Sequence, residues 1–505
     1  MPRILVGSVY FLRLDPARWA EHQPFPPLGT LYAAGMLRAA GHEVHFFDAM
    51  MAGAVAEWSA RVAEVRPDVA VLYDDNFNYL SKMCLSAMRQ AALDMIAAAT
   101  ALGARVVLCS ADAADHPDPY LDAGAGAVIV GEGELTLAEL TAAWRTGADD
   151  LSAIKGLAWR RDGKTARTPK REVLRDLDAL PPPAWDLVEM DAYRRIWRRH
   201  HGFFALNLVT SRGCPYSCNW CAKPIWGQGY AVRSPRQVAE ELAGLVCRAA
   251  PDYIWFMDDI MGLKPRWWGE FAAAIDALGV KVPFKCLSRA DLVLREGAAD
   301  DLRRAGCDIV WLGAESGSQA ILDAMDKDLS TAEIANATAT LKAAGIRVGH
   351  FLQFGYPGEG MAEIGQTLAM LRATRPDEMG ISVSYPLPGT VFFDRVRNQL
   401  RDKRHWDVSS DMAMLSRGPY TTAFYRHLHR HVHRDFRVRR AVAQLRGVLA
   451  GKADGGGHLR ALAFVVYCCV AIPLSWARLH LLRLMPHSAG PEVAPGAMTG
   501  GKAAS

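Results

Sequence analysis

Several features that would narrow the function of a protein are scarce in this sequence. Its 505 residues include only 10 cysteines, far below the density of a disulfide-stapled domain. The formal net charge is only +4 at pH 7, and no strongly cationic domain outside the C-terminal region is present to bind nucleic acid. No repeat of fixed period is visible, which argues against a solenoid.

The N-terminus also lacks the features of a secretory signal. Its first residues, MPRILVGSVYF, lead directly into an apolar, strand-like segment without a long apolar run or a small-residue cleavage site. We therefore expect a protein of the reducing cytoplasm, where neighbouring cysteines are more often metal ligands or redox groups than disulfides. Apolar residues make up 50% and charged residues 22%, which is typical of a globular protein, and the length predicts two or three domains.

Residues 1–145 alternate short β-rich runs with Ala/Leu-rich helical stretches. This alternation predicts a doubly wound parallel sheet, which is a Rossmann-like α/β domain. The expected strands are residues 4–8, 43–47, 69–73, 105–109 and 127–130. Ligands of such sheets bind at the carboxyl ends of the strands. The segments expected at those ends are residue 48 and residues 74–78, 110–112 and 131–134.

Residues 146–203 are predicted to be a connector, with a hairpin near residues 159–163 and a stiff proline stretch at 180–185. From 204 to 400 the strand–helix alternation returns. The expected strands are residues 204–210, 253–257, 282–287, 309–313, 348–354 and 380–384. Roughly six βα units predict a partial or complete (β/α) barrel of the TIM type, with function again at the C-terminal strand ends.

Three cysteines lie close together at the end of the first barrel strand. Cys214, Cys218 and Cys221 have the spacing C-x3-C-x2-C. Thiolates are the usual ligands of Fe–S clusters, and three ligands on a four-iron cluster leave one iron open to bind another molecule. The alternatives are a zinc site with a distant fourth ligand and an incidental cluster of cysteines.

The cysteine segment resembles the radical S-adenosylmethionine (SAM) superfamily, whose signature is C-x3-C-x-aromatic-C, with Trp220 in the aromatic position. The resemblance implies that Trp220 contributes to the SAM site. The resemblance implies a [4Fe–4S] cluster whose open iron chelates the amino and carboxylate groups of SAM. One electron, from an external flavodoxin- or ferredoxin-like donor, would then cleave the sulfonium to methionine and a 5′-deoxyadenosyl radical. The protein would orient the cofactors and shield the radical.

The same resemblance implies SAM contacts at the ends of later strands. Asp258 and Asp259 follow the second barrel strand, where the family places groups near the SAM amino group, although the commoner Gly-Gly-Glu is absent here. Arg289 follows the third strand and is expected to pair with the SAM carboxylate. Glu315 and Ser316 follow the fourth strand, in a segment that resembles the family's Glu-Ser-Gly-Ser near the ribose.

The N-terminal domain resembles the cobalamin (B12)-binding domain joined to many radical SAM enzymes. The resemblance rests on residues 26–29, 37–44, 48, 66–68 and 131–134, and the whole resemblance spans residues 1 to about 400. It implies the following cobalamin contacts: Asn76, Phe77, Asn78, Gly131, Gly133 and Glu134. The Asp-x-His-x2-Gly element that supplies a histidine to cobalt is absent, so we expect no histidine from this domain on the metal. A degenerate domain that binds no corrinoid is the alternative.

Residues 401–487 form an Arg/His/Leu-rich region that is predicted to be helical, and residues 488–505 a disordered tail. Four alternating histidines at 427, 429, 431 and 433 would divide between opposite sides of a helix. A solvated basic helix is the favoured interpretation, and contact with an anionic membrane surface or an anionic substrate group is the alternative.

An uncharged stretch of 17 residues follows at 461–477 and contains Pro473. It is at the short limit for a membrane span, so a buried or an interfacial helix is expected.

These patterns together predict a cobalamin-dependent radical SAM methylase. One SAM would methylate cobalamin, and a second would yield the radical that removes hydrogen from an unactivated carbon, which then takes the methyl group. The alternatives are an oxidative ring-forming enzyme, because the anaerobic magnesium-protoporphyrin ester cyclase shares this domain order, and a non-catalytic corrinoid- or metal-binding protein. We expect a small-molecule substrate and no nucleic-acid partner. The apolar and basic C-terminal elements favour a lipid-like substrate and peripheral membrane contact.

Overall fold

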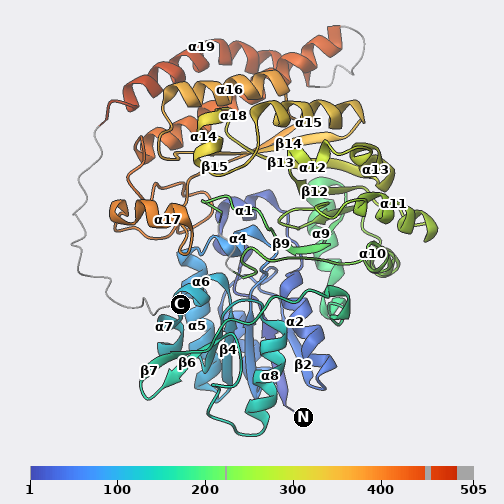
Figure 1. Cartoon of the computed structure of the whole chain (residues 1–505), viewed down its shortest axis with the longest axis vertical. Coiled ribbons are helices and arrows are strands. Elements are labelled where there is room, and N and C mark those ends of the chain that lie inside the picture. Colours follow the sequence, from blue (N-terminus) through green and yellow to red (C-terminus); the bar gives the residue numbers. More distant parts are fainter. Residues whose placement is uncertain (1, 222–224, 450–456, 486–505) are drawn as a thin grey trace.

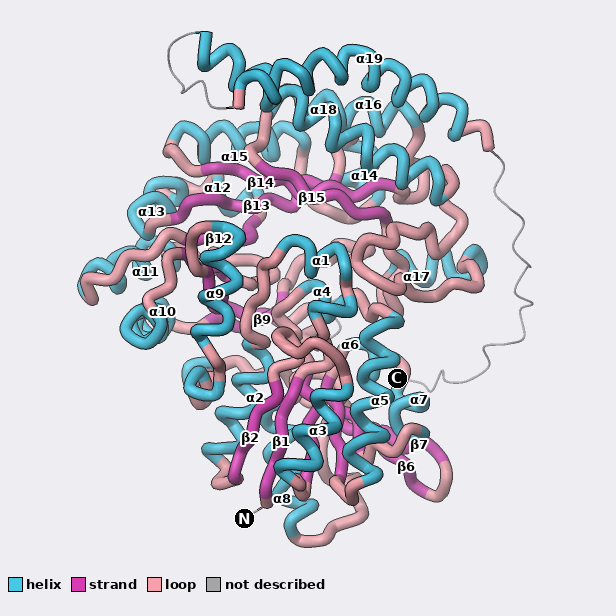
Figure 2. The backbone as a smooth tube through the Cα atoms, turned by 180° about the vertical axis from the view of Figure 1, so that it is seen from behind, coloured by secondary structure: helices cyan, strands magenta, loops and turns pink. Residues whose placement is uncertain are grey.

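The computed structural model describes residues 2–221, 225–449 and 457–485 and contains two large sheets with their helices, a two-stranded ribbon and a layer of C-terminal helices. The first sheet lies at one end of the molecule and the second sheet in its middle (Figure 1). The long helices α18 (Thr422–Leu449) and α19 (His458–Leu482) lie beyond the second sheet, at the end opposite the first (Figures 1 and 2). The predicted tail at 488–505 lies outside the described residues.

The first sheet has the order β2-β1-β3-β4-β5-β6-β7, and its first five strands are parallel. Every residue of β3 is buried, as expected for a central parallel strand covered by helices on both faces. This arrangement confirms the predicted Rossmann-like domain. Its strands are β1 (Arg3–Gly7), β2 (Glu43–Phe47), β3 (Val69–Tyr73), β4 (Arg105–Cys109) and β5 (Ala127–Ile129). Its helices include α1 (Pro16–Glu21), α2 (Leu28–Ala39), α3 (Ala56–Val65), α4 (Tyr79–Lys82), α5 (Ser86–Ala101), α6 (Ala111–Asp115), α7 (Pro117–Asp122) and α8 (Glu134–Arg145).

The expected hairpin is present as β6 (Leu157–Arg161) and β7 (Lys164–Arg167), and β6 pairs antiparallel with β5. The first sheet therefore takes in two strands from beyond residue 145. Helix α9 (Met190–His201) then leads to the second sheet. The division of the chain into domains stays a prediction.

The second sheet is parallel throughout, with the order β15-β14-β13-β12-β11-β8. Strands β8 and β15 lie at its two edges, so it is a partial barrel. Its strands are β8 (Ala205–Leu208), β11 (Tyr253–Phe256), β12 (Phe284–Ser288), β13 (Cys307–Glu315), β14 (Arg347–Phe354) and β15 (Glu378–Val383). Its helices are α10 (Pro235–Ala249), α11 (Trp267–Ala277), α12 (Ala290–Val293), α13 (Ala298–Ala305), α14 (Gln319–Ala324), α15 (Thr331–Ala343), α16 (Met361–Thr374) and α17 (Val391–Val396).

The histidines of α18 divide between two sides, as predicted. His427 and His431 are buried and bond to the backbone and side chain of Ser475 on α19, each at 3.1 Å. His429 and His433 bond to each other at 3.1 Å. The expectation of a solvated helix is wrong for the first pair, because α19 covers that side of α18.

Helix α19 is longer than the uncharged stretch and is long and apolar enough to cross a membrane by length and composition. The expectation of a buried helix is wrong. Only 17% of the most apolar 18-residue stretch of α19 is buried, because the helix contacts the protein along one side only. The expectation of an interfacial helix stays a prediction.

Candidate functional site

The cysteine loop starts from a small two-stranded ribbon at the end of β8. Strand β9 (Ser211–Gly213) pairs antiparallel with β10 (Tyr230–Val232), which holds the two ends of the loop together. Gly213 has φ +74°, and a Cβ there would lie 2.2 Å from the carbonyl oxygen of Gly229, so only glycine fits. The thiols of Cys214, Cys218 and Cys221 are all half-buried. Three thiols on one clamped loop fit the predicted cluster.

Asp258 holds the strand end that leads into this loop. Its carboxylate accepts hydrogen bonds from the Thr210 amide at 3.0 Å, the Thr210 hydroxyl at 2.8 Å and the Ser211 hydroxyl at 2.6 Å. Burial raises the pKa of Asp258 to about 6, although these hydrogen bonds favour the carboxylate. We assign Asp258 a positioning role at the loop, and its contact with SAM stays a prediction.

Asp259 connects the two α/β units. Its carboxylate pairs at 2.6 Å with the ammonium of Lys82, at the C-terminal end of α4 in the first unit. That ammonium also lies 5.1 Å from the centre of the Trp226 ring, just beyond the cysteine loop. The predicted SAM residue Asp259 is thus part of the contact between the two units.

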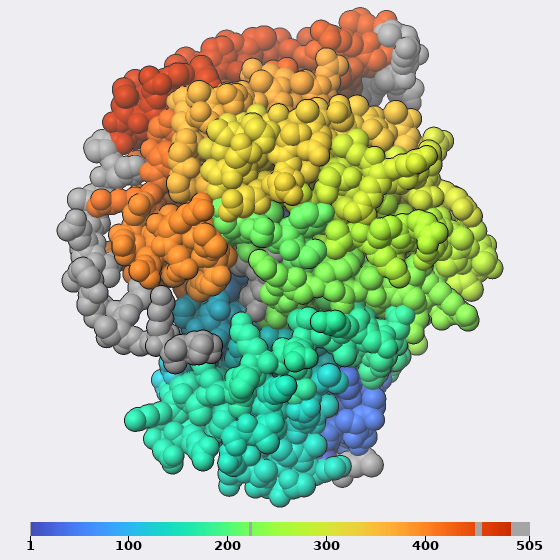
Figure 3. Space-filling view, viewed as in Figure 1, coloured from blue at the N-terminus to red at the C-terminus, as the bar shows by residue number. Residues whose placement is uncertain are grey.

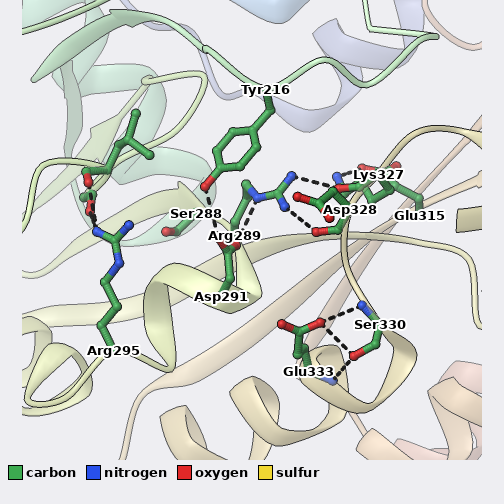
Figure 4. A network of polar contacts seen from close by, with 12 residues as sticks. Tyr216, Ser288, Arg289, Asp291, Arg295, Glu315, Lys327, Asp328, Ser330 and Glu333 are labelled. Carbon is green, nitrogen blue, oxygen red and sulfur yellow. Dashed lines mark hydrogen bonds and ion pairs between the residues drawn. The ribbon is translucent and has the colours of Figure 1, made fainter. Parts of the chain in front are cut away.

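Arg289 lies in a network beside the cysteine loop (Figure 4). Its Nε donates to Asp291 at 2.9 Å, and its terminal nitrogens donate to the carbonyls of Lys327 at 3.1 Å and Asp328 at 2.9 Å. The guanidinium carbon lies 3.6 Å from the ring centre of Tyr216, whose hydroxyl donates to Asp291 at 3.0 Å. Since Tyr216 belongs to the loop, Arg289 is a fixed cation next to it, as a carboxylate-binding group requires.

Glu315 forms a buried ion pair with Lys327, with 2.9 Å between the charged atoms and each side chain only 7% exposed. Burial lowers the pKa of Lys327, but Glu315 and the Cys218 thiol outweigh burial and raise it. The sequence analysis missed Lys327, because no local pattern connects it to a cysteine more than 100 residues earlier. Glu315 itself has φ +56°, a strained backbone for a residue other than glycine.

Ser316 and Trp220 are packed into the protein. The Ser316 hydroxyl lies 3.2 Å from that of Thr367 on α16 and accepts from the Ser318 amide at 3.1 Å. Trp220 packs against the cluster that contains Tyr356 and Phe392. These contacts fix the turn after β13 and the last part of the cysteine loop. Contact of Ser316 and Trp220 with SAM stays a prediction.

The segment after β3 reaches from the first unit toward the cysteine loop. Phe77 stacks on Trp226, with 5.1 Å between ring centres, and lies under the guanidinium of Arg212. The Asn78 side chain caps α4 by accepting from the Leu80 amide at 3.0 Å. Asn76 is 3% exposed. The predicted cobalamin residues therefore lie close to the loop region of the second unit.

A buried ion triad forms the second connection between the units. Arg212, two residues before Cys214, pairs with Glu134 at 2.8 Å and also with Glu132, and all three side chains are at most 6% exposed. Burial and Glu134 raise the pKa of Glu132, while Arg212 lowers it. Glu134 was predicted to contact cobalamin, whereas Arg212 was not among the predicted site residues.

The two glycines of the predicted cobalamin segment are required by the backbone. Gly131 has φ +97°, and a Cβ on Gly133 would lie 2.7 Å from the Tyr73 ring and 2.8 Å from the Cys109 sulfur. The loop after β5 can therefore approach the end of the sheet closely. Contact of these glycines with cobalamin stays a prediction.

The carboxyl edge of the first sheet fits a bound polar cofactor. Among the described residues, several buried polar atoms here have no hydrogen-bond partner. They are Ser8 Oγ, Asp75 Oδ2, Asn76 Oδ1, Glu134 Oε2 and Trp226 Nε1. Unpaired buried polar atoms are costly, so a ligand that bonds to them would stabilise this edge.

The inner face of the partial barrel carries aromatic rings and one lysine. His350 points outward to Thr338 of α15, so its neighbour Gly349, which pairs with Trp311, points inward. A Cβ on Gly349 would lie 2.4 Å from the Trp311 ring, which packs at a tilt against Phe351 with 4.6 Å between centres. Trp311 lies on β13, and Gly349 and Phe351 lie on β14.

Lys285 continues this inner face on β12. Its ammonium lies 4.0 Å from the centre of the Trp255 ring, and burial lowers its pKa to about 8. The rings thus give this wall an apolar surface, and the nearby carboxylates of Glu378 and Glu21 favour the charged form of Lys285 beside it.

Comparison with known proteins agrees with this site. Residues 208–371 match the family model of the Radical SAM superfamily. An uncharacterized methyltransferase of Pyrococcus horikoshii is 26% identical over 392 residues, covering 75% of this chain and 81% of the relative. The anaerobic magnesium-protoporphyrin IX monomethyl ester cyclase of Cereibacter sphaeroides is 26% identical over 388 residues, covering 74% of this chain and 61% of the cyclase.

The fold is also that of a solved structure. The cobalamin-dependent SAM radical enzyme OxsB, with aqua-cobalamin bound, superposes with a TM-score of 0.70 at 16% identity, covering 95% of this chain and 72% of that chain. Residues 208–371 therefore form a radical SAM domain, as the resemblance of the cysteine segment implied. A radical SAM domain implies a [4Fe–4S] cluster and SAM.

Proposed function

We propose that the protein is a cobalamin-dependent methyltransferase that adds a methyl group to an unactivated carbon of a small molecule. The observation that carries the proposal is the direct contact between the two candidate cofactor sites. The loop after β5 reaches Arg212 at the base of the cysteine loop, and Lys82 reaches Asp259 at the end of β11. A cofactor at the first edge would therefore lie next to the place where the radical forms.

The cofactor set of the structural neighbour supports this proposal. OxsB was solved with aqua-cobalamin bound, and the Pyrococcus relative is named a methyltransferase. In the present chain Asn76 and the glycine-containing loop at 131–134 would hold the corrinoid, with no histidine from this domain on the cobalt. Bound cobalamin would supply the methyl group.

The chain's own residues would orient and isolate the reaction. Cys214, Cys218 and Cys221 would hold the cluster, and Arg289 would neutralise the carboxylate of SAM from its fixed position beside Tyr216. The paired units would keep water away from the radical, since the Arg212 triad closes the space between them with buried side chains. Electrons would come from a flavodoxin- or ferredoxin-like donor in the cytoplasm.

The inner wall of the barrel indicates the substrate class. Trp311 and Phe351 offer adjoining aromatic faces, and Lys285 offers a cation to an acidic group. A largely apolar molecule with one anionic group fits this wall, which agrees with the expected lipid-like substrate.

The test is an anaerobic assay of protein reconstituted with iron, sulfide and cobalamin. It is given SAM, a reductant, and a metabolite extract from cells that lack the gene. The methylase predicts equal amounts of S-adenosylhomocysteine and 5′-deoxyadenosine, with a methylated product. Cys218→Ser should abolish 5′-deoxyadenosine, whereas Cys247→Ser, at an exposed cysteine on α10, should change neither product.

An oxidative cyclase is the second candidate, because the Cereibacter relative carries that name. A cyclase would form 5′-deoxyadenosine without a methylated product. Reconstituted protein that fails to cleave SAM would contradict both activities and favour a binding protein.

A further inference from the structure

Helix α19 has one narrow side against the protein and a broad apolar side facing away. The buried residues Ala461, Cys468 and Ser475 are spaced by sevens, so they form one stripe against α18. The opposite side, here called the outer face, consists of large apolar side chains that are 50% to 70% exposed. They are Leu459, Leu462, Val466, Val470, Leu474 and Leu481. Figure 3 shows α19 along the upper rim of the molecule, at its surface.

The charges around the outer face have one sign. Helix α19 contains no aspartate or glutamate. Arg460 and Arg478 are both exposed and lie 18 residues apart, which is five helical turns, so they project to the same flank of the helix. The neighbouring α18 carries seven arginines and a single acidic residue, Asp435. An apolar face flanked by arginines is complementary to an anionic lipid surface.

The packing of α19 decides how such a surface would be met. Helix α18 runs beside α19, with His427 and His431 bonded to Ser475. A spanning α19 would carry the arginines of α18 toward the hydrocarbon layer, where each charge is costly. A second copy of the chain is also a poor partner, because apposed outer faces would bring like-charged flanks together.

We propose that the outer face of α19 docks on an anionic lipid bilayer, with the helix parallel to the membrane plane and its arginines at the headgroups. The enzyme would then be a monotopic membrane protein that meets apolar substrates at the bilayer surface. The docking does not depend on the reaction that the enzyme catalyses.

Vesicle flotation of the full-length holoenzyme tests the proposal. We expect binding to phosphatidylcholine vesicles that contain phosphatidylglycerol, weaker binding at high salt, and at least about tenfold weaker binding to pure phosphatidylcholine. Replacing Arg460 and Arg478 together by glutamine should reduce binding to the anionic vesicles by about fivefold for each arginine.

A pair of matched double variants tests the outer face itself. Leu474→Glu with Leu481→Glu places charges on the outer face and should reduce vesicle binding by more than tenfold. Leu102→Glu with Leu278→Glu makes the same changes at exposed leucines elsewhere and should bind as the unaltered protein does. Both variants should melt at the temperature of the parent, since all four leucines are exposed.

Five outcomes would overturn the proposal. Three concern the vesicles: no binding, equal binding to neutral and anionic vesicles, and equal loss of binding in both double variants. The other two are resistance to alkaline carbonate extraction, which marks a spanning helix, and a dimer in light scattering that the outer-face variant alone dissolves. None of these outcomes bears on methyl transfer, which is assayed separately.

Discussion

The two candidate cofactor sites differ in how far the protein satisfies its own polar groups. Around the cysteine loop, Asp258, Arg289 and Lys327 are all bonded to neighbouring groups. At the carboxyl edge of the first sheet, by contrast, buried atoms such as Asn76 Oδ1 and Asp75 Oδ2 have no partner among the described residues. The charged groups that anchor the cysteine loop are therefore held by the chain itself, although the indole nitrogens of Trp220 and Trp226 have no partner among the described residues. The first edge would be completed by a ligand.

The Arg212 triad joins these two sites and is expected to show the largest effect. Arg212→Leu would leave Glu132 and Glu134 buried without a cation, which should lower the free energy of unfolding by about 3–5 kcal/mol. Arg212→Lys keeps the charge and should lose much less. Urea unfolding followed by circular dichroism measures both. A loss below about 1 kcal/mol for the leucine variant would mean that the triad does not hold the units together.

Two buried lysines of the barrel differ in the same way, because one has a direct carboxylate partner and the other does not. Lys327 has a carboxylate partner and a raised pKa, while burial beside aromatic rings lowers the pKa of Lys285 to about 8. Between pH 8 and pH 10 the unfolded chain binds more protons at Lys285 than the folded chain does. The free energy of unfolding of the parent therefore decreases as the pH falls through this window. Methionine does not titrate, so Lys285→Met escapes this loss. The free energy of unfolding of the variant minus that of the parent should therefore be larger at pH 7.5 than at pH 10, by about 2–3 kcal/mol.

The check is the difference in unfolding free energy between parent and variant across that pH range. Other groups cancel in this difference because they are common to both proteins. A difference that does not change with pH would show that Lys285 is not held in an apolar setting.

Asp258 tests the preorganised side of the comparison. Asp258→Ala removes the acceptor of the hydrogen bonds from Thr210 and Ser211, which should cost about 2 kcal/mol and lower the iron bound per chain after reconstitution. Asp258→Asn keeps one oxygen acceptor and should retain more iron. If the alanine variant binds the parent's amount of iron, Asp258 does not position the loop.

Asn76 and Asn78 test the candidate cobalamin site at the carboxyl edge of the first sheet. Asn76→Ala should weaken binding of hydroxocobalamin by about tenfold, because its buried oxygen has no partner among the described residues and would accept a hydrogen bond from the cofactor. Asn78→Ala removes the cap of α4 and should cost about 1 kcal/mol of stability. Spectroscopic titration measures the first effect and thermal melts the second, and an unchanged cobalamin affinity of Asn76→Ala would contradict the comparison.

The sequence predicted the parts of the structure that follow from local patterns. The first four strands of the first unit lie within one residue of the expected ends, because each is a short apolar run between helical segments. The Ala/Leu-rich stretch between β3 and β4 forms two helices, α4 and α5, with Cys84 between them at φ +53°.

The pairings between distant residues could not be predicted. Arg212 and Glu134 are separated by 78 positions, and Lys82 and Asp259 by 177, with no sequence signature that matches them. The exposure of α19 was hidden for a related reason, since an uncharged run has the same composition whether it is buried or faces a membrane.

Methyl transfer to carbon is the proposed reaction, and labelling of the methyl group follows it directly. Cells with and without the gene are fed methionine with a trideuterated methyl group, and their metabolites are compared by mass spectrometry. We expect a gene-dependent product that carries the intact trideuteromethyl group on carbon. A gene-dependent product that has lost hydrogen and gained no label would contradict it.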